Sequence, residues 1–143
     1  MKALTLRQPY ATLVAIGAKR IETRSWRTRY RGPLAIHAAA TFPSQARELC
    51  SREPFRSALL AGGYEQAEGL PVGRVIARCR LVDCLPTTAE AGLAHGDVPP
   101  VGSEEWAFGD YSQGRFIWLL ADVERVEPPR PARGALGLWE WLA

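Results

Sequence analysis

Gly17 separates two different sequence patterns, and the change between them limits how the start of the chain can fold. Before it, Tyr10 and Leu13 follow helical spacing after Pro9, which suits the first turn of a helix. After it, residues 19–26 alternate in the manner of a strand. A glycine at this boundary suits the C-terminal cap of the helix. The pattern therefore predicts a helix followed by a strand that is too charged for a core.

The strand predicted over residues 19–26 carries charged and aromatic side chains on one face: Glu22, Arg24 and Trp26. The other face holds Ile21, Thr23 and Ser25. By the same alternation Lys19 belongs to the second face, with Ile21. It stands where the chain enters from a turn, however, and alternation is a poor guide there. A strand face with this much charge is unsuited to core packing and therefore indicates a functional role. We favour a polar cleft that holds an anionic or planar ligand.

Further strands and helices are expected between turns rich in glycine and proline. Strands are expected over residues 3–7, 34–38, 74–84 and 116–126, the last one broken by Pro128, with a short strand closing 134–141. Helices are expected over residues 44–52 with Ser44 as cap, over 54–60, and from Thr87 or Thr88 to about 94. Several strands with interspersed short helices indicate an α+β fold, a small barrel-like sheet with helices on one side.

A chain of 143 residues fits one domain, here residues 1–143. No apolar run approaches the roughly 20 residues that span a bilayer. The segment after Met1 has no signal-peptide hydrophobic region. We therefore expect a soluble, cytoplasmic protein with no membrane partner.

Neither a metal nor a cofactor is expected. The three cysteines, Cys50, Cys79 and Cys84, are odd in number and lack CxxC spacing, so buried thiols are expected instead of a disulfide or zinc site. His37 lies on a predicted strand and is expected to be a hydrogen-bonded structural residue, and His95 stands alone. No phosphate-binding glycine loop, metal motif or serine-nucleophile motif occurs.

The basic residues are mostly arginine and gather early in the chain. Of the 18 lysines and arginines, only Lys2 and Lys19 are lysines. Six basic residues lie against the single acid Glu22: Lys19, Arg20, Arg24, Arg27, Arg29 and Arg31. The planar guanidinium suits phosphate and can stack on bases. A local anion-binding patch is therefore predicted, although a GC-rich gene also favours arginine and some of these side chains will only be solvated.

Several blocks together resemble the ASCH family, the activating signal cointegrator homology domain: residues 6–11, 17–26, 30–38, 109–115 and 137–139. The hallmark GxKxxExR pattern matches from Gly17 to Arg24. The resemblance implies a PUA-like fold, a mixed pseudo-barrel sheet with flanking short helices. It also implies a cleft lined by the lysine–glutamate–arginine segment and by the helix after the first strand. Members are commonly regarded as RNA-binding or coactivator-linked modules.

A few members of this family resemble small hydrolases, which act on acetylated cytidine or on RNA. The deacetylating branch uses a lysine, a threonine three residues later and a distant glutamate. Lys19 matches the lysine, but Glu22 occupies the threonine position, and Thr23 should face the opposite side of the strand. Glu90 is a loose match for the distant glutamate. The resemblance therefore does not transfer the complete deacetylation mechanism to this chain.

Three interpretations of Lys19 and Glu22 remain open: a ligand-binding pair, a catalytic pair with Glu22 as general base, or an ordinary salt bridge. A carboxylate is costly beside phosphate alone but can accept from a base amino group. Glu22 amid cations therefore favours a base or nucleoside as part of the ligand.

Other candidate binding residues lie along the chain. Arg7 and Gln8 precede a helix start that could help to bind an anion. Tyr111 and Arg115 flank a turn that the resemblance brings near the cleft. Trp26 could stack on a base or pack in the core, Trp118 and Trp139 are expected in the core, and Trp106 could make an exposed contact. The predicted binding set is Arg7, Gln8, Lys19, Glu22, Arg24, Ser25, Trp26, Arg31, Tyr111 and Arg115.

The first functional hypothesis is a nucleic-acid-binding module whose partner is RNA or another single strand, or a nucleoside. Lys19, Arg24 and Arg31 would meet phosphate or carbonyl oxygens, and Arg7 and Arg115 would extend the positive surface. The alternative is a small metal-independent hydrolase of a modified nucleoside or RNA, with Lys19 and Glu22 as its catalytic residues. A third possibility is a protein-interaction domain of a transcription or translation complex.

Overall fold

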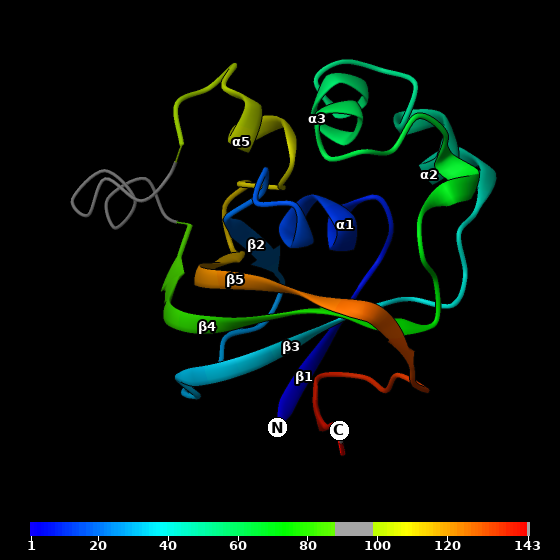
Figure 1. Cartoon of the computed structure of the whole chain (residues 1–143). Coiled ribbons are helices and arrows are strands. Elements are labelled where there is room, and N and C mark those ends of the chain that lie inside the picture. The colour runs from blue at the N-terminus through cyan, green and yellow to red at the C-terminus, as the bar shows by residue number, and fades with distance from the viewer. Residues whose placement is uncertain (88–98, 143) are drawn as a thin grey trace.

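A six-stranded mixed sheet forms the body of the protein, which a computed structural model describes over residues 1–87 and 99–142 (Figure 1). The strands are β1 (Lys2–Leu6), β2 (Ile21–Arg24), β3 (Gly32–Ala38), β4 (Arg74–Pro86), β5 (Phe116–Pro131) and β6 (Leu138–Glu140). Their order across the sheet is β2-β5-β4-β3-β1-β6. β1 pairs parallel with β3, and the other neighbouring strands are antiparallel.

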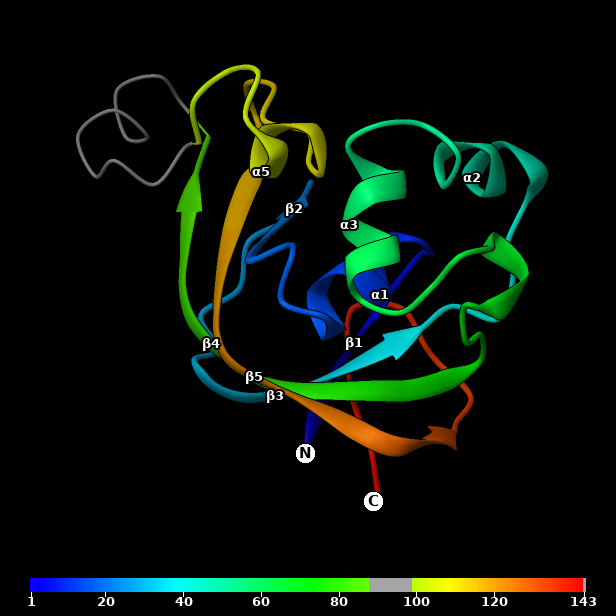
Figure 2. The ribbon, with the colours of Figure 1, turned by 45° about the horizontal axis from the view of Figure 1, so that its top comes forward.

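Short helices cover one side of this sheet (Figures 1 and 2). They are α1 (Tyr10–Ala15), α2 (Ser44–Leu49), α3 (Phe55–Ala61) and α5 (Glu104–Ala107), with a 3-10 turn at Ala67–Gly69. This arrangement confirms the predicted α+β fold with a mixed, barrel-like sheet. In the described residues, no helix combines the length and apolar character needed to cross a membrane.

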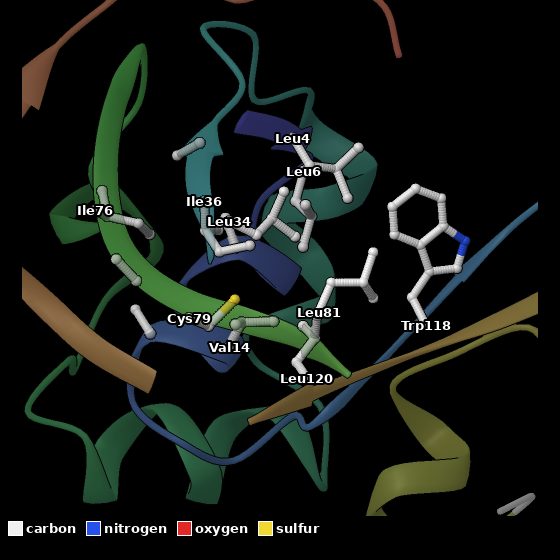
Figure 3. Close-up of a cluster of buried hydrophobic side chains, with 14 of the residues drawn as sticks. Leu4, Leu6, Val14, Leu34, Ile36, Ile76, Cys79, Leu81, Trp118 and Leu120 are labelled. Atoms are coloured by element: carbon white, nitrogen blue, oxygen red, sulfur yellow. The ribbon is translucent and has the colours of Figure 1, made fainter. Parts of the chain in front are cut away.

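The main core lies between α1 and the sheet, and Figure 3 shows its side chains. Its largest fully buried member is Trp118 of β5. A second cluster packs the outer side of α1 against α3 through Leu13, Phe55 and Leu59. Helix α1 is therefore buried from Ala11 to Ala15, since it lies between the sheet and α3. This double packing fixes the position of the turn that follows the helix.

Gly17 ends α1 as predicted. Its φ is +83°, and the backbone amides of Ala18 and Lys19 both donate to the Leu13 carbonyl at 3.0 Å. Glycine adopts a positive φ at little steric cost. This turn places Lys19 two residues before the start of β2.

The long strand β5 corrects one prediction, because it continues through Pro128 and Pro129 to Pro131. The pairing with β4 is irregular at this point: Ala77 is opposite Arg125, whereas Val75 is opposite Arg130. The intervening β5 residues form a bulge, and a bulge tolerates prolines because its residues do not all pair.

Smaller differences concern element ends. Ser44 is the first residue of α2 and makes no capping hydrogen bond, since Pro43 holds the cap position. Strand β2 ends at Arg24, so Ser25 and Trp26 lie beyond it. The helix expected up to residue 94, together with Glu90 and His95, lies outside the described residues.

The barrel does not close between β2 and β1. Strand β2 is one edge of the sheet and β6 the other, and among the described residues no backbone pairing joins β2 to β1 or β6. Instead, the Arg24 guanidinium reaches from β2 and donates through Nη1 to the Thr5 carbonyl of β1 at 3.3 Å. One arginine side chain thus spans the opening, and the opening is where the candidate site lies.

Candidate functional site

A cleft of about 680 Å³ occupies the gap between β1 and β2. One wall is formed by residues 22–26 of β2 and its continuation, and another by Thr5, Arg7 and Tyr10. Residues 108–110 and Arg115 contribute a third wall, and residues 135–137 a fourth. Six predicted binding residues line this cleft: Arg7, Glu22, Arg24, Ser25, Trp26 and Arg115.

Two acids, Glu22 and Asp110, line the cleft, and Glu22 is only 8% exposed. Its Oε2 accepts from Arg24 Nη1 at 3.1 Å, and its Oε1 lies 3.5 Å from Lys19 Nζ. The two cations balance the charge that burial would otherwise penalise. Each carboxylate oxygen can accept more than one hydrogen bond, so Glu22 retains capacity for a donor that enters the cleft.

Lys19 is fully buried, with 0% exposure, and lies behind Glu22. Its Nζ donates to the carbonyls of Ile21 and Phe108, each at 2.6 Å, which leaves its third hydrogen for Glu22. Burial lowers the pKa of this amine, although Glu22 and Glu105 oppose that shift. The expected direct contact of Lys19 with a ligand does not fit this arrangement, because the amine has no exposed surface and its donors are already used. Lys19 instead supports Glu22 and joins β2 to the wall at Phe108.

The cationic residues of the cleft differ in how firmly the protein holds them. Arg24 is committed to Glu22 and Thr5, and its guanidinium carbon lies 5.7 Å from the Trp26 ring centroid. Arg115 donates to the carbonyls of Asp110 and Thr23, both at 3.2 Å, and its Nε lies 3.4 Å from the Asp110 carboxylate. Arg7 is exposed and makes no side-chain hydrogen bond or ion pair within the described residues. Arg7 is therefore the most available of the three for an added anion.

The structure places the other predicted residues outside the cleft. Gln8 is 1% exposed and secures the start of α1, since its side chain exchanges hydrogen bonds with Thr12 and also donates to the Pro71 carbonyl. Arg31 pairs with Asp83 at 3.0 Å, away from the cleft-lining residues. Tyr111 is buried, and burial raises its pKa. The reason in each case is tertiary packing that a local pattern does not report.

Tyr111 and Trp106 form a stacked pair, with ring centroids 5.1 Å apart and planes 14° from parallel. Trp106 is half-buried in this pair and does not line the cleft, so the exposed contact predicted for it does not fit. The Tyr111 hydroxyl has no hydrogen-bond partner among the described residues.

Several lining residues are not predicted by the sequence patterns. Tyr10 follows helical spacing and is not among the predicted binding residues, but it lines the cleft together with Glu22. Its pKa is raised by burial and by the charge of Glu22, while Arg7 opposes the shift. Asp110 lies in a block that carries the family resemblance, so a signal exists for it. Leu136 has no signal, because nothing in a Gly–Ala–Leu–Gly run marks a binding residue.

Within the described residues, no group of three or more His, Cys, Asp or Glu side chains could hold a metal ion.

The wall formed by residues 135–137 depends on a buried polar network around His37, which is 2% exposed. Trp139 Nε1 donates to Thr5 Oγ1 at 3.1 Å, and His37 Nδ1 lies 3.1 Å from the same oxygen. His37 Nε2 lies 2.7 Å from the Ala132 carbonyl, which can only accept. The proton of the neutral imidazole therefore sits on Nε2, which leaves Nδ1 to accept from the Thr5 hydroxyl. His37 has the structural role that the sequence predicts.

This network predicts a pH dependence of stability. Burial lowers the pKa of His37, so the unfolded state, with a pKa of about 6.5, takes up the proton first as pH falls. The free energy of unfolding should therefore fall from about pH 6.5 toward the lowered pKa. Urea unfolding at pH 7.5, 6.5 and 5.5 measures this. In a His37→Gln variant the decrease over that window should shrink, and an equally large decrease would contradict the assignment to His37.

Comparison with known proteins adds two findings. The profile of the ASCH domain matches residues 4–130 of this chain. Activating signal cointegrator 1 of Homo sapiens is 37% identical over 137 residues, and the protein of the same name from Mus musculus is 35% identical over 137 residues. These alignments cover 96% of this chain but only 22% of each relative, so the chain spans less than a quarter of their length.

Proposed function

Because this chain belongs to the ASCH domain family, we propose that its cleft binds single-stranded nucleic acid, with RNA as the preferred ligand. The observation that carries the proposal is one cleft that combines three arginines with a nearly buried glutamate. The arginines would contact phosphate, and the glutamate would contact a base.

The phosphate contacts are assigned to Arg7 and Arg115. Both line the cleft, and a guanidinium can hold two phosphate oxygens at once. Arg24 is assigned a lesser direct role, because its Nη1 already bridges Glu22 and the Thr5 carbonyl. Arg31 is left out of the proposed interface, since it does not line the cleft.

The base contact is assigned to Glu22. A carboxylate repels phosphate, but it accepts from the amino group of a base, as a glutamate does for the cytosine amino group. Tyr10 and Trp26 line the same cleft and offer aromatic surface, and stacking on an aromatic ring is worth about 1–3 kcal/mol per base. The volume lies within the range of about 300–1,000 Å³ that small-ligand pockets occupy. One nucleotide therefore suits the cleft better than a duplex.

A short RNA with a fluorescent end, titrated at 50, 100 and 200 mM salt, tests the proposal. Arg7→Ala and Arg115→Ala should each weaken binding several-fold at low salt. Each should also reduce the slope of log affinity against log salt by about 0.7 for every phosphate that the arginine neutralises. Arg52→Ala removes an equal charge from an exposed position outside the cleft and serves as the control. Unchanged affinity and slope in both cleft variants would refute the phosphate contacts.

The hydrolase alternative has weaker support. Its lysine would be Lys19, whose donors are all engaged, and Glu22 stands where the deacetylating branch has its threonine. We expect acetylated cytidine to stay intact, by mass spectrometry, after incubation with the protein and a chelator. Turnover that Glu22→Gln abolishes would favour the enzyme instead.

A further inference from the structure

Leu136 is 98% exposed and lies at the cleft, between Ala135 and Gly137, which also line it. Single exposed leucines are common on protein surfaces, so exposure alone indicates nothing. Two further properties distinguish this residue. The backbone of the loop that carries it is held in place, and the cleft that it borders also presents three arginines and the aromatic rings of Tyr10 and Trp26.

The loop of residues 132–137, which joins β5 to β6, is fixed at its start. The Ala132 amide donates to the Gly73 carbonyl at 3.1 Å, and the Ala132 carbonyl accepts from His37 Nε2 at 2.7 Å. At Gly134, a Cβ atom would lie 2.6 Å from Thr5 Oγ1 and 2.8 Å from His37 Cε1. The backbone therefore passes in direct contact with β1 and β3 at a place where only glycine fits.

The same loop is also fixed at its end. Gly137 has a φ of +66° and turns the chain into β6, where Leu138 pairs with Leu4 of β1. Leu136 is thus presented by a short loop that is anchored on both sides. Because the loop backbone is already ordered, a ligand that covers Leu136 would fix only its side-chain rotamers, which costs less than ordering a flexible loop.

The neighbours of Leu136 indicate what could cover it. The three arginines of the lining outnumber its two acids, Glu22 and Asp110, and Glu22 and Trp26 suit a base. Proteins that bind the minor groove of duplex DNA frequently insert apolar side chains such as leucine between neighbouring bases, which unstacks them, and the bases of a single strand offer the same contact. A leucine at the mouth of a cleft of about one nucleotide would meet the base next to the one inside.

We propose that Leu136 is a wedge that separates the base held in the cleft from the adjacent base of a single strand. This inference rests on the proposed function. It adds an apolar contact that no charged residue of the cleft supplies, and it makes the protein unstack the strand that it binds.

A short single-stranded RNA that contains 2-aminopurine, whose fluorescence rises when it is unstacked, tests the wedge. Binding to the unaltered protein should raise the fluorescence. Leu136→Ala should suppress most of that rise and weaken binding about three- to ten-fold, as expected when a partly buried leucine side chain is truncated. The slope against salt should not change, because every arginine that faces phosphate is still present. Leu136→Met, which keeps an apolar side chain of similar size, should restore much of both signals.

Leu142→Ala is the matched control, since Leu142 is 90% exposed and does not line the cleft. Both alanine variants should unfold at the same urea concentration as the unaltered protein. If the RNA binds, and Arg7→Ala weakens it, but Leu136→Ala matches the unaltered protein in affinity and fluorescence, the wedge is overturned while the proposed function stands. If the unaltered protein binds no RNA, the proposed function fails and the wedge with it.

Discussion

Replacing Lys19 by methionine is expected to lower the free energy of unfolding by about 3–5 kcal/mol, the range seen when one partner of a buried ion pair is removed. The amine has no exposed surface and donates to two carbonyls as well as to Glu22. Methionine fills similar space but supplies no donor. The variant therefore leaves two buried carbonyls unsatisfied and Glu22 with one cation fewer.

Urea unfolding followed by circular dichroism measures this decrease. Lys2→Met is the control, because Lys2 pairs with Glu140 at the surface and exposed pairs contribute at most about 1 kcal/mol. Lys19→Met combined with Glu22→Gln should recover part of the stability, since an uncharged side chain needs no cation. A Lys19→Met protein within about 1 kcal/mol of the original would show that Lys19 is not the support we infer.

Replacing Trp118 by alanine should lower the free energy of unfolding by a similar amount, about 3–5 kcal/mol, because large-to-small changes in a core remove packing and leave a cavity. Trp118 is 0% exposed and is paired with Glu22 across the β2–β5 ladder. Its ring meets the edge of Trp26 at 4.8 Å between centroids, and its Nε1 lies 3.4 Å from the Trp26 carbonyl. The tryptophan thus supports the strand that carries the cleft residues.

Two comparisons separate packing from other effects in this experiment. Trp118→Phe keeps most of the apolar volume and should be less destabilising than Trp118→Ala. Trp106→Ala alters a half-buried tryptophan outside the main core and should also be less destabilising. Circular dichroism is the appropriate signal, because the substitutions change the fluorescence itself. A decrease below about 1 kcal/mol for Trp118→Ala would mean that the core is not organised around this side chain.

The charged strand shows how far local patterns reach. Alternation places Glu22, Arg24 and Trp26 on one face, and all three line the cleft. The same alternation puts Thr23 on the opposite face, yet Thr23 lines the cleft as well, since Arg115 and Asp110 approach it from the other side. Parity describes one strand and says nothing about what packs around it.

Lys19 illustrates the same limit. The sequence marks it as important, and the GxKxxExR spacing brings it next to Glu22. Whether its amine faces a ligand or the interior depends on the Phe108 carbonyl, which lies 89 residues away in the chain. A lysine that must satisfy a distant buried carbonyl is not distinguishable, in its own segment, from one that binds phosphate.

Local sequence patterns were sufficient to predict the helix that ends at Gly17, the strand faces, the fold class and most of the charged side chains of the cleft. These features follow from backbone geometry and side-chain chemistry, which act over a few residues. Long-range packing was needed to leave the barrel open between β2 and β1, to place Lys19 beneath the opening and to bring Leu136 to its border. The curl of a sheet and the positions of distant loops depend on contacts between residues far apart in the chain, and no local pattern records those contacts.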